Sequence, residues 1–491
     1  MTITSPDEVW KLRIGGDWVE PKDGTYSIIN PATEEVVGEA PEASLDDVAD
    51  AVAAAKEALG PWSRTSRQER SRLLKAASDL WREREAQVSP LVQAETGAIW
   101  AVAAGAQVPG ATNRLAEYAE LALRDWDQGL VPIASATSPL APGALLGAVA
   151  ARQPVGVVGC ITPYNFPLTN TAGKIGPALA MGNTVVIKPA PQDPLGIIEL
   201  VRVLDEVGFP PGVVNLLTGS KPEIGAALVD SRDVDMISFT GSTVVGSKIF
   251  EAGGKTMKRL LMELGGKGAA LVLADADIPT AVRNIVSVWA FHSGQICTAP
   301  TRVVAHRSIY QELVDSLAAA AAFLPTGDPL DPATVVGPVI SEVARTRIES
   351  MIASGKDDGA EIVVDGRRPS HLDKGYFVAP TLLAECRNDM FVVREEIFGP
   401  VIVVVPFDDE EEGIAIANDS DYGLYDYVFS KDTARAYEVG RRLRAGNVGI
   451  NTTGRNPFTP FGGFKMSGVG RDGNHYGMEA YSELQSLVWP A

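Results

Sequence analysis

The sequence predicts an α/β protein with two parallel-sheet domains and a small β arm, and three observations carry this prediction. Its 491 residues correspond to two or three domains at about 150 residues each. Apolar residues make up 45% of the chain, which suffices for a large core and excludes disorder as the main state. From residue 155 onward, short apolar runs alternate with helical stretches, as strands joined by crossover helices do.

The first half of the chain is predicted to supply one sheet. Apolar residues recur every three or four positions over 44–59 and 66–95, which predicts amphipathic helices, and 10–18 alternates like an opening hairpin. Continuous apolar runs then predict buried parallel strands at 155–161, 184–189, 213–219 and 236–241. Polar or glycine-rich residues follow three of these runs. Because parallel sheets bind ligands beyond the carboxyl ends of their strands, we expect a site at that edge.

A second α/β unit is predicted to begin near Glu263. Its strands are expected at 269–274, 302–306, 401–407, 427–430 and 447–451. The uncharged segment 131–151 and the C-terminal segment 467–491 fit neither unit. Both are interpreted as β arms, which usually pair with another surface, so we expect a homodimer or homotetramer.

The charge balance narrows the class of function. The chain has 43 Lys and Arg against 62 Asp and Glu, a net charge of −19, and this argues against nucleic acid or an anionic membrane as partner. Three dispersed cysteines and four scattered histidines support neither a disulfide framework nor a zinc site. The first ten residues lack the features of a signal peptide, and prolines interrupt the uncharged segments. We therefore expect a cytoplasmic protein that acts on small molecules.

Seven short segments between residues 163 and 468 resemble motifs of the aldehyde dehydrogenase superfamily. They are PYNFP at 163–167, KPA at 188–190, FTGSTVVG at 239–246, MELGGK at 262–267, SGQIC at 293–297, EEIFGP at 395–400 and PFGGFKMSG at 460–468. The resemblance implies a Rossmann-like coenzyme domain over 1–130 and 152–262, a catalytic domain over 263–466, and an oligomerisation arm over 131–151 and 467–491. It also implies metal-free oxidation of an aldehyde to a carboxylic acid with NAD or NADP.

The resemblance assigns three catalytic roles. Cys297 would attack the aldehyde to give a thiohemiacetal, which becomes a thioester when hydride leaves for the nicotinamide. Asn165 would donate a hydrogen bond to the oxyanion formed in that attack, and Glu263 would activate the water that hydrolyses the thioester. Without the motifs, Cys297 would be interpreted as a buried structural thiol, Asn165 as a turn residue and Glu263 as a solvated surface residue. The motifs favour the catalytic roles instead.

A glycine-rich turn predicts a coenzyme site. The pattern G-x-T-x-x-G runs from Gly241 to Gly246 after a β run and before a helical stretch, a context suited to phosphate at a helix N-terminus. The resemblance implies that Gly241, Ser242 and Gly246 approach the pyrophosphate. It places the following residues near the nicotinamide half of the coenzyme: Glu396, Phe398 and Tyr164.

The coenzyme choice departs from the family pattern. Lys188 is expected near the adenosine ribose, and Pro191 stands where NAD-preferring members commonly have Glu. Proline neither accepts from the ribose hydroxyls nor repels a 2′-phosphate, and Lys188 would then be free to pair with that phosphate. We therefore expect NADP to be tolerated, with NAD also possible.

The sequence is less informative about the residues that contact the substrate. Phe166 and Phe461 are expected to line the acyl pocket. If Arg455 points inward, it could pair with the carboxylate of a semialdehyde acid; an exposed position on its loop is the alternative. Two other functions stay open. One is a coenzyme A-acylating semialdehyde dehydrogenase, against which Glu263 argues, and the other is a catalytically silent relative, expected to lack Cys297 or Glu263.

Overall fold

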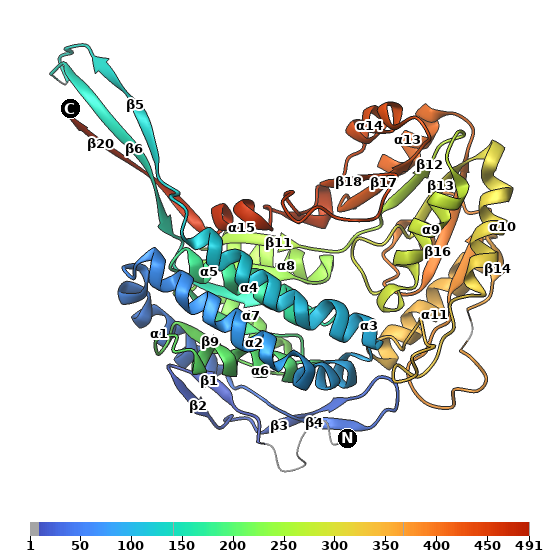
Figure 1. Cartoon of the computed structure of the whole chain (residues 1–491), viewed down its shortest axis with the longest axis horizontal. Helices are drawn as coiled ribbons and strands as arrows, with labels where there is room; N and C mark the ends of the chain where they lie inside the picture. Colours follow the sequence, from blue (N-terminus) through green and yellow to red (C-terminus); the bar gives the residue numbers. More distant parts are fainter. Residues whose placement is uncertain (1–8, 141, 367, 491) are drawn as a thin grey trace.

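The computed structural model describes residues 9–140, 142–366 and 368–490, and Figure 1 shows two sheet-centred bodies with a projecting hairpin. The first sheet has the order β19-β11-β10-β7-β8-β9-β1-β2. Its strands are β19 (Gly468–Val469), β11 (Arg259–Glu263), β10 (Met236–Thr240), β7 (Val157–Ile161), β8 (Thr184–Lys188), β9 (Val214–Leu216), β1 (Leu12–Ile14) and β2 (Asp17–Val19). From β11 to β9 neighbouring strands run parallel, so the α/β prediction is confirmed.

Helices cover both faces of this sheet (Figure 1). They are α1 (Leu45–Ser63), α2 (Arg67–Thr96), α3 (Trp100–Val102), the π-helix η1 (Ala103–Gln107), α4 (Val108–Ala122), α5 (Pro167–Ala180), α6 (Leu195–Glu206), α7 (Pro222–Asp230), α8 (Thr243–Gly254) and α15 (Asn474–Ala480). Ser44 and Ser66 cap α1 and α2, and Gly97 ends α2 in the left-handed conformation. The two helices predicted over 44–59 and 66–95 are therefore confirmed.

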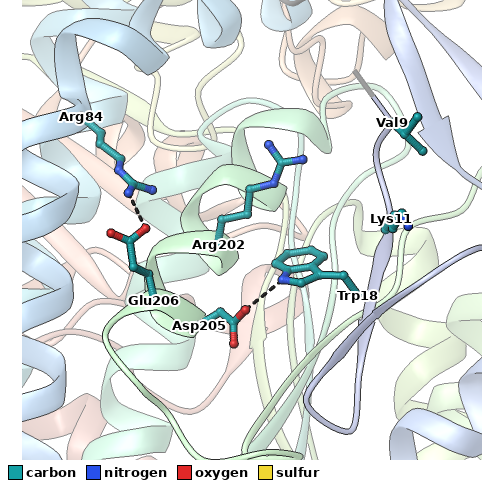
Figure 2. Close-up of a pocket in the computed structure, with 7 residues that line it drawn as sticks. All are labelled: Val9, Lys11, Trp18, Arg84, Arg202, Asp205 and Glu206. Carbon is teal, nitrogen blue, oxygen red and sulfur yellow. Dashed lines mark hydrogen bonds and ion pairs between the residues drawn. The ribbon is translucent and has the colours of Figure 1, made fainter. Parts of the chain in front are cut away.

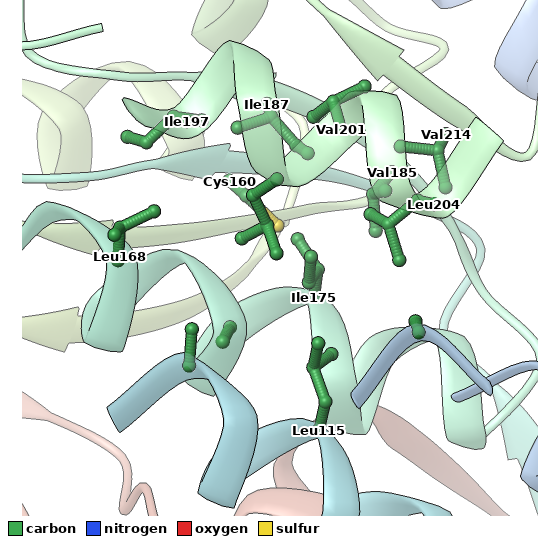
Figure 3. Close-up of a cluster of buried hydrophobic side chains, with 14 of the residues drawn as sticks. Leu115, Cys160, Leu168, Ile175, Val185, Ile187, Ile197, Val201, Leu204 and Val214 are labelled. Carbon is green, nitrogen blue, oxygen red and sulfur yellow. The ribbon is translucent and has the colours of Figure 1, made fainter. Parts of the chain in front are cut away.

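The core of this body lies between the sheet and helices α4, α5 and α6. Figure 3 shows part of it, where the sulfur of Cys160 lies among Leu, Ile and Val side chains. Cys160 is fully buried, and burial raises the pKa of its thiol to about 12. This cysteine is thus a packing residue, as expected for a small apolar side chain.

The second sheet has the order β14-β15-β16-β13-β12-β17-β18. Its strands are β14 (Glu361–Val364), β15 (Thr381–Ala384), β16 (Val401–Phe407), β13 (Arg302–His306), β12 (Ala269–Val272), β17 (Tyr425–Phe429) and β18 (Asn447–Ile450). The surrounding helices are α9 (Ile278–Trp289), η2 (Phe291–Gly294), η3 (Arg307–Ile309), α10 (Tyr310–Ala321), α11 (Glu342–Asp357), α12 (Phe391–Arg394), α13 (Glu410–Asn418), α14 (Thr433–Arg442) and η4 (Lys465–Ser467). The five predicted strands of this unit are all present.

A third sheet forms the arm that projects from the body in Figure 1. It has the order β20-β6-β5, with β5 (Gln128–Ser135), β6 (Ala144–Pro154) and β20 (Ser482–Pro490). A separate hairpin joins β3 (Thr25–Ile29) to β4 (Val36–Pro41). Residues 467–481, expected in the arm, instead pair with β11 as β19 and pack on α4 and α5 as α15. Within the described residues, no helix is both long and apolar enough to span a membrane.

Candidate active site

Cys297 lies on a tightly anchored loop that follows α9 and η2. His292, Ser293 and Gly294 all have positive φ, which turns the chain sharply before the cysteine. Two side chains of the loop anchor it to the segment around residues 337–340. Ser293 Oγ donates to the Gly337 carbonyl at 2.8 Å, and Gln295 Oε1 accepts from the Ile340 amide at 3.0 Å. Such consecutive strained residues persist only where the surroundings fix them, so the position of Cys297 is imposed by the fold.

Two glycines bring this loop against the segment that carries Glu263. A Cβ added to Gly266 would lie 2.3 Å from the carbonyl oxygen of Cys297, and one added to Gly265 would lie 2.4 Å from Oε2 of Glu396. The Gly266 amide also donates to Glu396 Oε1 at 2.8 Å. Only glycine permits the approach at position 266, where the neighbouring atom is backbone. Strand β11 ends at Glu263, directly before this turn. Three residues predicted for the site, Glu263, Cys297 and Glu396, therefore lie around it.

Glu263 is a buried carboxyl group without a partner. Neither oxygen has a hydrogen-bond partner, and a Cβ added to Gly462 would lie 2.8 Å from Oε1. Burial raises its pKa well above the usual range, and the charge of Asp472 raises it further, whereas Lys174, Arg471 and Arg455 lower it. Unpartnered buried carboxyls with displaced pKa values are concentrated at functional sites.

The thiol of Cys297 is protonated at neutral pH in this structure. Its pKa is raised to about 12, mainly by burial and then by the charge of Glu396, while Arg455 opposes the shift. The residue itself is partly exposed, unlike Cys160 and Cys386. An accessible thiol with a raised pKa can attack a carbonyl only if a base removes its proton.

Asn165 lies beside the cysteine loop, just before α5. Its Nδ2 atom donates to the Gln295 carbonyl at 2.8 Å, and its own backbone carbonyl accepts from Gln107 Nε2 at 3.2 Å. Nδ2 carries a second hydrogen, for which no acceptor is found among the described residues. The side-chain amide of Asn165 is thus anchored to Gln295, two residues before Cys297, and its second N–H can still donate a hydrogen bond.

Aromatic rings surround this centre. Phe166 stacks on Phe291 with ring centroids 6.2 Å apart, and Phe461 packs against the same apolar cluster as Cys297. Tyr164 and Phe398 meet edge to face at 5.9 Å, and Phe398 adopts a positive φ of 57°. The structure therefore brings Tyr164 and Phe398, both predicted to lie near the nicotinamide, into contact with each other.

The glycine-rich turn is built as the sequence predicts. Ser242 caps α8 through its side chain, which accepts from the Val245 amide at 3.4 Å. A Cβ on Gly241 would lie 2.5 Å from the ring of Phe239, and one on Gly246 would lie 2.5 Å from Leu264. Gly246 therefore lets α8 pack closely against Leu264, and the N-terminus of α8 offers free amides to a phosphate.

Lys188 is partly engaged within the protein. Its Nζ donates to the carbonyls of Pro189 at 3.0 Å and Gly219 at 3.1 Å, which leaves one of its three hydrogens for another acceptor. Burial lowers its pKa to about 8, although the charge of Glu42 opposes the shift. Carbonyls from two separate segments converge on this side chain, a feature that the local sequence does not encode.

Two polar residues at the site were missed by the sequence analysis. Lys174 is buried on α5, its Nζ lies 3.1 Å from Ser238 Oγ, and its charge lowers the pKa of Glu263. Asp472 acts on Glu263 in the opposite direction. A lone Lys or Asp at such positions carries no motif signal.

No second reactive centre emerges elsewhere in the described chain. Figure 2 shows a pocket beside the N-terminal hairpin whose charged side chains are paired, Arg84 with Glu206 and Asp205 with Trp18 Nε1 at 2.9 Å. Among the residues that the structure describes, no group of His, Cys, Asp and Glu side chains could hold a metal ion.

Known proteins match the chain along nearly its whole length. The model of the aldehyde dehydrogenase family matches residues 18–487. A 3-succinoylsemialdehyde-pyridine dehydrogenase from a Pseudomonas species is 38% identical over 478 residues, which are 97% of each chain. The crystal structure of betaine aldehyde dehydrogenase from Staphylococcus aureus with NAD+ has a TM-score of 0.93 at 34% identity, covering 98% of this chain and 95% of that one. An aldehyde dehydrogenase from Bacillus cereus with NAD+ gives 0.92 at 36% identity, covering 99% and 97%.

Proposed function

Because the chain belongs to the aldehyde dehydrogenase family, we propose that it oxidises an aldehyde to a free carboxylic acid by covalent catalysis on Cys297. The observation that carries the proposal is the unpartnered carboxyl of Glu263, held next to the Cys297 loop by Gly266. The relatives' names differ in substrate, one naming betaine aldehyde and another a pyridine semialdehyde, so they do not select one for this chain.

The first half of the reaction forms an enzyme-bound thioester. The sulfur of Cys297 adds to the aldehyde carbon, and the thiol proton passes to a base, for which Glu263 is the nearest unpartnered candidate. The carbonyl oxygen becomes an oxyanion, which the second hydrogen on Asn165 Nδ2 stabilises. Losing one such donor typically costs about 10²–10³ in rate.

The coenzyme supplies the hydride acceptor. Its pyrophosphate fits the turn of Gly241, Ser242 and Gly246, where α8 presents backbone amides, and this fit supports NAD binding. Tyr164 and Phe398 are assigned to the nicotinamide, and Glu396, already held by the Gly266 amide, to its ribose. NAD bound there accepts the hydride that leaves the thiohemiacetal carbon.

The second half hydrolyses the thioester. After Glu263 has released the first proton to solvent, its carboxylate removes a proton from water while the water oxygen attacks the thioester carbon; the C–S bond breaks and Cys297 leaves as a thiolate. General-base help of this kind contributes about 10²–10⁴ in rate. A buried base at this place favours hydrolysis over transfer to coenzyme A and over a catalytically silent role.

We also propose that NADP is tolerated, although less well than NAD. Pro191 presents no carboxylate to repel a 2′-phosphate, but Lys188 has only one hydrogen left to donate beyond the two that it gives to carbonyls. We expect NAD to be preferred by less than about 100-fold in kcat/KM, which corresponds to about 2.7 kcal/mol.

The arm supports a homo-oligomer. Its two edge strands expose Val131, Ile133, Leu484 and Val488 to solvent. Rows of exposed apolar residues on edge strands are expected to be covered by another chain, here a second copy. With three free thiols, the assembly suits a reducing compartment such as the cytoplasm.

Product analysis tests the proposed function. Purified protein, NAD+ and a short aldehyde should yield NADH and free acid in equal amounts, with no requirement for coenzyme A, and Cys297→Ser should yield neither. A product that appears only with coenzyme A would contradict hydrolysis, and activity retained in Cys297→Ser would contradict the assigned nucleophile.

A further inference from the structure

Arg455 carries a positive charge to the wall of the proposed active site. It lies on the loop after β18, and its guanidinium carbon is 3.9 Å from the ring centroid of Phe461. Phe461 packs against the cluster that also contacts Cys297, and the next residue, Gly462, borders Oε1 of Glu263. The charge of Arg455 also lowers the pKa of both Cys297 and Glu263, so the guanidinium lies close enough to act on both groups.

This guanidinium has no anionic partner among the residues that the structure describes. No ion pair or hydrogen bond of its side chain is found there, and the residue remains exposed to solvent. By contrast, Arg114, the other arginine whose charge acts on Arg455, is paired with Glu117 at 3.1 Å. Desolvation lowers the pKa of Arg455, whereas the charge of Cys297 raises it.

We propose that Arg455 selects aldehydes that carry an anionic group, foremost a carboxylate, at the end remote from the aldehyde. This inference rests on the proposed function, since it assigns the substrate class of the same site. A guanidinium fixed flat on a ring presents a planar fork that binds a carboxylate or a phosphate through two hydrogen bonds. The net charge of −19 repels anions at long range, so their recognition must come from such a local cation.

The same arrangement disfavours cationic aldehydes. A quaternary ammonium group binds against the face of an aromatic ring, and Arg455 already covers one face of Phe461. A substrate ammonium in this place would also meet the like charge of the guanidinium. We therefore expect ω-amino and trimethylammonium aldehydes to be poor substrates.

Matched substrates and variants test the proposal. Succinic semialdehyde is compared with its neutral methyl ester and with 4-aminobutanal, and glyceraldehyde 3-phosphate with glyceraldehyde, which separates carboxylate from phosphate recognition. The variants are Arg455→Met, Arg455→Lys and, as control, Arg444→Met, which removes a similar guanidinium from the ring of Phe464 at 5.6 Å. The readout is the ratio of kcat/KM for the anionic and neutral member of each pair, in which effects on Cys297 itself cancel.

The wild type should favour succinic semialdehyde over its ester, and Arg455→Met should lower that ratio by about 10- to 100-fold, with a smaller loss in Arg455→Lys. Arg444→Met should leave the ratio unchanged. An equal loss for acid and ester in Arg455→Met, or a wild type that prefers 4-aminobutanal, would overturn the proposal. A preference confined to glyceraldehyde 3-phosphate would overturn the carboxylate assignment.

A second measurement keeps this inference separate from the proposed function. Succinate should slow the alkylation of Cys297 by iodoacetamide in the wild type but not in Arg455→Met. If no aldehyde yields NADH, the proposed function fails, and this protection still decides whether Arg455 binds carboxylates. Equal protection in both proteins would overturn the inference even if aldehydes are oxidised.

Discussion

The contact between Gly266 and the Cys297 loop gives the sharpest prediction. In Gly266→Ala, the new Cβ would lie 2.3 Å from the Cys297 carbonyl oxygen, whereas ordinary contact begins at 3.4 Å. Because the obstacle is backbone, the cysteine segment or the Glu263 segment must shift by about 1 Å, and such a displacement of reacting groups costs about 10² in rate. We expect kcat/KM to fall by about 100-fold, or about 2.7 kcal/mol in the transition-state free energy.

Two alanine variants control for this substitution. Gly225→Ala lies in α7 with no atom within 4 Å of the new Cβ, so it should keep full activity and gain slightly in stability. Gly265→Ala meets only the carboxylate of Glu396, a side chain that can move, so it should raise the KM for NAD more than it lowers kcat. The activity and the melting temperature are measured for each variant. Gly266→Ala that melts like the wild type and retains wild-type kcat/KM would refute the reasoning.

Three further predictions follow from the electrostatics and the arm. The pKa of Cys297 is raised to about 12, so alkylation of the coenzyme-free enzyme by iodoacetamide should rise about tenfold per pH unit from 7 to 10; a plateau below pH 9 would contradict this. Because the charge of Arg455 lowers that pKa, alkylation in Arg455→Met should be slower than in the wild type throughout this range, and unchanged rates would place the guanidinium too far away. Replacing Leu484 and Val488 by Asp should reduce the oligomer seen by light scattering, and an unaltered mass would mean that the arm is not the contact.

Part of the site could be predicted from the sequence because motifs encode local backbone geometry. Gly246 leaves room for Leu264 where α8 packs against the segment after β11, and Gly241 leaves room for the ring of Phe239. Contacts between distant segments carry no such signal. The carbonyls that bind Lys188 come from Pro189 and from Gly219, which lies on another loop, so the sequence did not indicate that two of its three hydrogens are already used.

In the fold too, local patterns could be predicted from the sequence, whereas contacts between distant segments could not. Continuous apolar runs predicted the buried strands of both sheets, because burial on both faces selects for them. The pairing of β19 with β11 was not predicted, since Gly468 and Val469 form only a two-residue edge whose partner is set by tertiary packing. Likewise, no sequence pattern could decide whether Arg455 points inward, because its direction depends on the position of the Phe461 ring.

The central claim is that Glu263 hydrolyses an acyl group carried by Cys297, and rapid-mixing kinetics of Glu263→Gln test it most directly. With a good aldehyde and NAD+, this variant should release a burst of up to one NADH per active site and then turn over about 10²–10⁴ times more slowly than the wild type. Intact mass should show the acyl group on Cys297. A variant that turns over at the wild-type rate, or that forms no burst and no acyl adduct, would contradict the account.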